Sequence, residues 1–458
     1  MNEEVDTMTQ MSSEKIKDYR KTIPGFEEIC GTESFFWINE GKPTVEEANK
    51  VSDYSIDDAI DAEKRLDRFA PFIKLSFEDT VESDGIIESP ISEIDEFQKY
   101  LEKYYDAEIP GKMYLKRDDL LPIAGTIKAR GAIYEVLKHA EDLAIEHGLI
   151  SGYDDDYTKF ASPEFKEFFS DYGIVVGTTG NLGISSGVMG RTLGFTVTIH
   201  MSAEAKQWKK DYLRSFGINV VEHDTNFTEA VRNGRAESDA DPKSYFVDDE
   251  HSVDLFLGYT VAGARMVKIL DEMNITVDED HPLFVYLPCG IGGSPGGITF
   301  GLKQQFGDNV HCFFAEPTQM PSMLLGLLSK EYDNICVDDA GIEAKTVMDG
   351  LAVPRTSGFV SRTMEKYFDG GYTLSEEESM RHLAAMIDCE NIPLEPAALA
   401  GTPGPAKLFT TEAGQTYIKE KGLEDKVDKI THISWATGGS MVPESDMQEF
   451  YDAGKALQ

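Results

Sequence analysis

The chain has 458 residues, 41% of them hydrophobic and 10% aromatic, so it can fill the cores of two or three packed units, which excludes global disorder. Its 82 acidic residues outnumber 43 lysines and arginines, and the net charge of −39 excludes binding to nucleic acid or anionic lipid. The five cysteines include no CxxC pair, which predicts a protein without disulfides or structural zinc. The sequence has no long apolar run and a polar start, so we expect a cytoplasmic protein without a membrane span.

The first 110 residues are polar, and we expect them to form a helical layer with helices over 46–69 and 91–105. From residue 111 onward, short apolar runs alternate with segments of helical periodicity. Strands are predicted at 112–120, 173–181, 195–201 and 218–223, and helices at 127–148, 182–194 and 203–217. This alternation is typical of a parallel α/β sheet.

A second α/β run begins near residues 255–270. It continues with strands at 283–290, 310–316 and 430–440. The chain therefore predicts two α/β units, and glycine turns follow several of their strands. Such turns at the carboxyl ends of strands are where α/β sheets bind ligands.

Lys128 lies at the start of a predicted helix, in the segment Thr-Ile-Lys-Ala-Arg-Gly. The positive end of a helix favours the neutral form of a lysine amine, which suits a nucleophile that forms a Schiff base. By itself, the position also fits an ordinary exposed lysine.

A glycine-rich loop, Pro-Cys-Gly-Ile-Gly-Gly-Ser-Pro-Gly-Gly, spans residues 288–297 directly after a predicted strand. Its small residues allow backbone N–H groups to converge on an anion in front of a helix. It is not a dinucleotide fingerprint, because Pro295 occupies the third glycine position, and no Gly-Lys-Ser/Thr closes it as a P-loop. The phosphate of a different cofactor fits better, and a tight structural turn is the alternative.

Two polar residues follow other predicted strands. Asn181 lies in Thr-Thr-Gly-Asn-Leu-Gly, where its amide can bond a phenolate oxygen or cap a helix. Thr437 lies in Ala-Thr-Gly-Gly, where its hydroxyl can face a pyridine nitrogen.

Together, these four motifs resemble those of the fold type II pyridoxal phosphate (PLP) enzymes, and among them the D-serine dehydratases (D-serine ammonia-lyases). The similarity runs from about residue 111 to 443 and is carried by TIKARGAIYEVLKHAE, TTGNLGISSG, DDEHSVDLFLGY, PCGIGGSPGG, FFAEPTQMPSMLLGL, DGLAVPRTSGFV, LEPAALAG and WATGGSMVP. The resemblance implies an α/β fold like that of the tryptophan synthase β subunit, with the active site between two domains. Residues 1–172 and 261–458 are expected to form the large PLP-binding domain and 173–260 the small one.

The resemblance also assigns roles to residues. Lys128 is expected to carry the Schiff base, Asn181 to lie beside the 3′-oxygen of the cofactor, and Thr437 to face its ring nitrogen. The phosphate cup is expected to consist of Gly290, Gly292, Gly293, Gly296 and Gly297. Thr126, Thr178 and Ser294 depart from the family pattern, but none of them removes a needed functional group.

The activity that the resemblance implies is dehydration and deamination of D-serine to pyruvate and ammonia, with D-threonine giving 2-oxobutyrate as a secondary reaction. Candidates for contact with the substrate are Thr179, Asp248 and Asp249, although the acidic pair also fits a solvated surface. We further expect a monovalent cation, K⁺ or Na⁺, near Glu316. The alternative there is a carboxylate satisfied by neighbouring amides.

Two other interpretations stay open. One is a related lyase that acts on L-threonine, L-serine or diaminopropionate, because it shares the lysine, the asparagine turn and the phosphate cup. The other is a non-catalytic amino-acid-binding protein on the same scaffold, against which Lys128 and the complete glycine loop argue. In each case the expected partner is a small amino acid, and the protein is expected to be a monomer or a homodimer.

Overall fold

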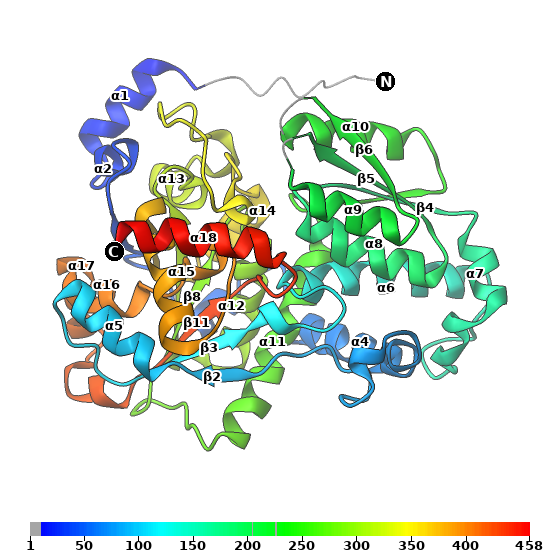
Figure 1. The fold of residues 1–458 in the computed structure, drawn as a ribbon. Helices are drawn as coiled ribbons and strands as arrows, with labels where there is room; N and C mark the ends of the chain where they lie inside the picture. Colours follow the sequence, from blue (N-terminus) through cyan, green and yellow to red (C-terminus); the bar gives the residue numbers. More distant parts are fainter. Residues whose placement is uncertain (1–10, 204, 225–226) are drawn as a thin grey trace.

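The computed structural model describes residues 11–203, 205–224 and 227–458 (Figure 1). Its larger sheet has seven strands in the order β1-β10-β9-β8-β11-β3-β2. Their bounds are β1 (Phe36–Ile38), β2 (Ile91–Glu93), β3 (Lys112–Arg117), β8 (Leu283–Pro288), β9 (Val310–Pro317), β10 (Gly370–Leu374) and β11 (Thr431–Ala436). The smaller sheet has four strands in the order β6-β5-β4-β7.

The central strands of the larger sheet, from β10 across to β3, run parallel to one another. Every residue of β8, β9 and β11 is buried, as expected for a parallel sheet that is covered on both faces. The short strands β1 and β2 close the two edges in antiparallel orientation. Both come from the first 110 residues, where only helices were predicted.

The smaller sheet consists of β4 (Gly173–Gly177), β5 (Thr196–Ser202), β6 (Asn219–His223) and β7 (Ser244–Val247), all parallel. Helix α10 (Phe227–Asp239) covers one face, and α8 (Asn181–Leu193) and α9 (Gln207–Ser215) cover the other (Figure 1). All four strands lie within residues 173–260, the segment expected to form the small domain.

Helices α6 (Lys128–Glu146) and α11 (Val253–Glu272) lie where the two sheets meet, and they pack on each other. A Cβ atom on Gly258 would lie 2.9 Å from the Cα atom of Gly131, so only glycine allows this close crossing. Because α11 runs without a break through residues 260 and 261, the boundary proposed there falls inside a helix. The division into two domains remains our proposal.

The helical layer before residue 111 contains α1 (Ser13–Thr22), α2 (Phe26–Cys30), α3 (Val45–Asn49), α4 (Ile56–Ser76) and α5 (Asp95–Tyr105). The single helix predicted over 46–69 is wrong. A turn separates α3 from α4, because the capping box of Ser55 and Asp58 starts a new helix. The helix predicted over 91–105 is also shorter, because its first residues form β2.

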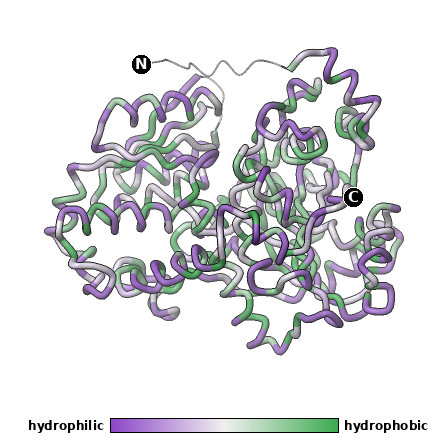
Figure 2. Tube along the Cα trace, turned by 180° about the vertical axis from the view of Figure 1, so that it is seen from behind, coloured by the Kyte–Doolittle hydropathy of each residue, from purple (hydrophilic) through white to green (hydrophobic). Residues whose placement is uncertain are grey.

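The remaining helices surround the two sheets. They are α7 (Pro163–Phe169), α12 (Gly293–Phe306), α13 (Ser322–Ser329), α14 (Gly358–Met364), α15 (Glu376–Glu390), α16 (Gly404–Thr410), α17 (Glu412–Glu420) and α18 (Glu444–Leu457). Hydrophilic residues recur along the outer helices and loops of both units (Figure 2). Among the described residues, no helix has the length and hydropathy needed to cross a membrane.

Candidate active site

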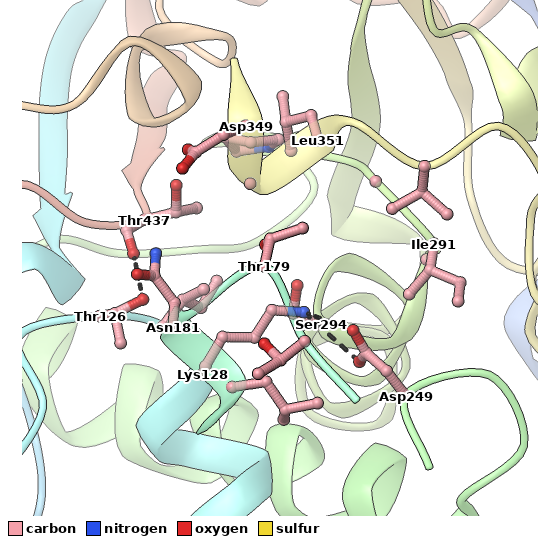
Figure 3. Close-up of a pocket in the computed structure, with 18 of the residues that line it drawn as sticks. Thr126, Lys128, Thr179, Asn181, Asp249, Ile291, Ser294, Asp349, Leu351 and Thr437 are labelled. Carbon is pink, nitrogen blue, oxygen red and sulfur yellow. Dashed lines mark hydrogen bonds and ion pairs between the residues drawn. The ribbon is translucent and has the colours of Figure 1, made fainter. Parts of the chain in front are cut away.

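A cavity lies where the strand ends of both sheets face each other (Figure 3). It brings together segments that the sequence analysis singled out far apart in the chain. The predicted residues that line it are Lys128, Thr179, Asn181, Asp249, Gly290, Gly292 and Thr437. We call this cavity the catalytic pocket.

Lys128 is the first residue of α6, and its side chain points into the pocket. The start of the helix is held in place because the Oγ1 of Thr126 and the backbone N–H of Ile127 each donate to the carbonyl oxygen of Thr437, at 2.9 Å. The Nζ atom of Lys128 lies 3.3 Å from a carboxylate oxygen of Asp249. The amine is therefore paired with an acid in a partly buried site.

The two adjacent acids Asp248 and Asp249 have different surroundings. Asp249 faces Lys128, whereas Asp248 accepts from Arg235 at 2.5 Å and lies 3.2 Å from the ring of His251. Burial raises the pKa of Asp248, but these partners outweigh burial and hold it below its ordinary value. Asp249 alone of the pair lines the pocket, so it is the acid that is placed to act on a ligand.

The glycine loop after β8 turns into α12. Gly292 has a φ of 110°, which favours glycine, and a Cβ atom there would lie 2.4 Å from the Cε atom of Met323. The backbone N–H groups of Gly293 and Ser294 begin a helix, so they have no acceptor within it and can bind an anion. This backbone cradle at a helix N-terminus fits the phosphate of PLP.

The predicted glycines do not all have the same surroundings. Gly290 and Gly292 line the catalytic pocket, and Gly293 is the first residue of α12. In contrast, a Cβ atom on Gly296 would lie 2.7 Å from Val360, and one on Gly297 would lie 2.5 Å from the carbonyl oxygen of Phe256. These two glycines allow α12 to pack closely against α14 and α11, and they are not among the residues that line the pocket.

Asn181 begins α8, and its side-chain amide lies in the pocket. Its Nδ2 atom donates to the carboxylate of Glu395 at 3.0 Å, which leaves a second N–H for a ligand. Glu395 was not proposed from the sequence, although it lies in the quoted segment LEPAALAG. Its role depends on contacts with residues more than 180 positions away, and the sequence pattern carries no signal for them.

The turn before Asn181 is fixed from within. The Oγ1 of Thr178 accepts from the backbone N–H of Gly180 at 2.9 Å, and the next residue, Thr179, lines the pocket. On another wall, Thr437 is nearly buried and follows β11. Thr179 and Thr437 therefore offer hydroxyl groups to a bound molecule from two different elements (Figure 3).

Glu316 is the penultimate residue of β9 and is fully buried, outside the pocket lining. Its two carboxylate oxygens accept from the backbone N–H groups of Met323 and Leu324, at 2.8 and 2.9 Å, in the first turn of α13. Burial raises its pKa to about 8 despite these bonds. Each carboxylate oxygen thus accepts one hydrogen bond from a backbone amide. This is the arrangement that the sequence analysis gave as the alternative to a cation.

Together, a lysine at a helix start, a glycine-rich anion cradle and convergent amide and hydroxyl groups form a candidate active site that fits PLP. The sequence profile of the family described as pyridoxal-phosphate dependent enzyme matches residues 84–413, and the chain belongs to that family. The fold is the α/β fold of type II PLP enzymes. In that fold it resembles diaminopropionate ammonia lyase from Escherichia coli in complex with D-serine, with a TM-score of 0.67 at 16% identity over 92% of this chain and 97% of that one.

More similar relatives narrow the class. The probable D-serine dehydratase of Bacillus cereus (strain ZK / E33L) is 53% identical over 97% of this chain and 98% of its own length. That of Geobacillus stearothermophilus is 51% identical over 98% of this chain and 97% of its own length. The chain therefore belongs to the D-serine dehydratase family of PLP-dependent lyases.

Glu395 leads to a prediction about pH. The pKa of Glu395 is raised from 4.5 to about 7, chiefly because the carboxyl group is buried. Lys209 and the hydrogen bond from Asn181 act to lower the pKa, whereas Asp349 and Asp119 act to raise it. The neutral form therefore prevails below about pH 7, and the ionised form, which accepts more strongly from Asn181, prevails above it. The absorbance of bound PLP is expected to change between pH 6 and 8, roughly one unit either side of that pKa. The same titration of Glu395→Gln is expected to be flat there, and a surviving transition would exclude Glu395 as its source.

Proposed function

We propose that this protein, with PLP bound to Lys128, eliminates water from D-serine to give aminoacrylate, which hydrolyses to pyruvate and ammonia, and that D-threonine gives 2-oxobutyrate as a secondary reaction. The observation that carries the proposal is the pairing of Lys128 with Asp249 at 3.3 Å beside the glycine cradle. The curated relatives named probable D-serine dehydratase support the choice of substrate.

The pocket residues divide the work of holding the cofactor. The loop at Gly290–Gly293 would bind its phosphate, Asn181 its 3′-oxygen and Thr437 its ring nitrogen. When bound, PLP supplies an electron sink for the charge left at Cα of the substrate. A threonine hydroxyl does not keep a pyridine nitrogen protonated as a carboxylate would, so Thr437 favours loss of the β-hydroxyl over transamination.

Lys128 and Asp249 would move the protons. When it is not linked to the cofactor, the Nζ atom of Lys128 would be free to take the proton from Cα. Asp249 lies close enough to that nitrogen to receive the proton and pass it to the departing β-hydroxyl. A carboxyl group there also orients the hydroxyl by a hydrogen bond. Thr179, in the turn opposite, would bind the substrate carboxylate.

The competing interpretations predict different products. Incubation of the PLP-loaded enzyme with D-serine is expected to release pyruvate and ammonia in equal amounts. An amino-acid-binding protein on this scaffold would release neither. A lyase for L-threonine, L-serine or diaminopropionate would release product only from those substrates, and that result would overturn the proposal. Gel filtration is expected to show a monomer or a homodimer.

A monovalent cation near Glu316 stays a prediction. Each carboxylate oxygen of Glu316 keeps a lone pair beyond the one that Met323 or Leu324 occupies, so the residue can still serve as a ligand. Activity is expected to rise when K⁺ or Na⁺ replaces a bulky organic cation, and Glu316→Gln is expected to remove that dependence. Cation-dependent activity that survives Glu316→Gln would exclude this residue as a ligand.

A further inference from the structure

A second cavity lies beside the catalytic pocket, between α9 and the first half of α18. We call it the outer cavity. Its walls come from α9, the loop before Asp349 and α18. Asp349 and Glu395 line both cavities, so the two share a wall. The outer cavity is thus in a position to connect the catalytic pocket with solvent.

The shared wall contains two polar contacts that join the two sheet units. Lys209 of α9 lies under the turn before α8, because a Cβ atom on Gly180 would lie 2.3 Å from its Cδ atom. Its buried Nζ atom reaches Asp349 at 3.0 Å. Beside this ion pair, Asn181 donates to Glu395. Side-chain contacts therefore form part of the wall that the two cavities share.

The outer cavity offers both signs of charge on an apolar surface. Trp208, Val347 and Phe450 supply the apolar part. The Nζ atom of Lys206 lies 5.4 Å from the ring centroid of Phe450, and Asp446 lies on the same helix as that ring. The ammonium of Lys206 and the carboxylate of Asp446 both line the cavity, and this pair of charges suits the carboxylate and the ammonium of a free amino acid.

The net charge of the protein gives a reason for a lysine at the outer cavity. The protein carries a net charge of −39, and a field of that sign repels carboxylates, including that of pyruvate. Lys206 places a positive charge at the outer cavity, whereas Lys209 is paired there with Asp349. A carboxylate that approaches the outer cavity is attracted by the ammonium of Lys206.

We propose that the outer cavity is the passage by which amino acids enter the catalytic pocket, and that Lys206 at its rim attracts their carboxylate. This deepens the proposed function and rests on it for the identity of the substrate. The pair of Lys209 and Asp349 forms the inner end of the passage.

The proposed passage can be tested by attaching a bulky chemical label inside the outer cavity. Val347 lines the outer cavity but not the catalytic pocket, and it is 44% exposed, so Val347→Cys accepts a thiol reagent. The probe is aminooxyacetate, an amino-acid mimic that reacts with bound PLP whatever the natural substrate is. A bulky label on the introduced thiol is expected to slow that reaction, followed by PLP absorbance, by about tenfold or more, whereas a methylthio label changes it little.

Two proteins serve as controls for the label. Val51→Cys, at a 63% exposed position between α3 and α4, is labelled with the same reagents. The unsubstituted protein is treated in parallel, because its partly buried Cys336 and Cys389 also contain thiols. Neither control is expected to slow the reaction. An unchanged rate in bulky-labelled Val347→Cys would overturn the passage.

The role of Lys206 is tested by charge. Lys206→Glu is expected to slow the reaction with anionic aminooxyacetate several-fold and to leave that with neutral hydroxylamine unchanged. Lys17→Glu on α1, outside the outer cavity, makes the same change in net charge and is expected to affect neither. If both variants slowed the reaction with aminooxyacetate equally, the net charge of the protein would explain the effect, and the role of Lys206 would be contradicted. Both reagents react with bound PLP without any turnover of substrate. If the protein failed to make pyruvate from D-serine, that result would therefore contradict the proposed function and leave the passage intact.

Discussion

Lys128→Ala is expected to lower turnover by about three orders of magnitude or more, because it removes the covalent link to PLP and the base at Cα in one change. The same variant is expected to lose the absorbance of lysine-bound PLP. Borohydride reduction of the parent protein with bound PLP, followed by peptide mapping, is expected to place the label on Lys128. Label on another lysine would contradict the assignment.

A matched lysine separates this effect from damage to the helix. Lys138 lies on the same helix and pairs with Asp142 at 2.9 Å and with Asp254 at 3.2 Å, away from the pocket. Lys138→Ala is expected to keep turnover and bound PLP within a few-fold of the parent protein. Equal losses in the two variants would show that the helix, rather than the amine of Lys128, is responsible.

Gly292→Asp is expected to weaken PLP binding by about 100-fold or more, which corresponds to roughly 3 kcal/mol. The backbone φ of 110° disfavours any side chain, the added Cβ atom meets Met323, and the added carboxylate repels the phosphate. Titration of the PLP-free protein with PLP, followed by absorbance, measures the change.

Two controls assign that loss to its cause. Gly292→Ala carries the strain without the charge and is expected to bind PLP more tightly than Gly292→Asp. Gly307→Asp carries the charge at another left-handed glycine, after α12, where a Cβ atom meets nothing within 4 Å, and it is expected to bind PLP normally. Full occupancy of Gly292→Asp at low PLP concentration would exclude the loop as the phosphate site.

The strand-and-turn pattern was enough to predict the elements that carry the glycine loop, Asn181 and Thr437. Apolar runs that end in glycine turns determine both the strand and the place where it stops. The pattern could not separate Asp248 from Asp249, because the path of the loop after β7 decides which of two neighbouring acids faces the pocket. The edge strands β1 and β2 were missed because three residues are too few to show periodicity.

Contacts between distant segments account for other differences. Glu395 belongs to the site because Asn181, 214 positions earlier, donates to it. The sequence does not distinguish Gly296 and Gly297 from Gly292. In the structure, these two glycines allow neighbouring helices to pack closely against α12. The outer cavity arises in the same way, because Lys206, just before α9, and Phe450 of α18 meet only in the folded chain.

The most direct test of the account is the rate of pyruvate release from D-serine and from L-serine, measured separately with the same PLP-loaded protein. A site that holds the carboxylate, amine and β-hydroxyl at three fixed points presents the Cα–H of only one enantiomer to its base. We expect D-serine to react at least about tenfold faster, a preference of roughly 1.4 kcal/mol between the transition states. Equal rates for the two enantiomers, or faster release from L-serine, would contradict the central claim.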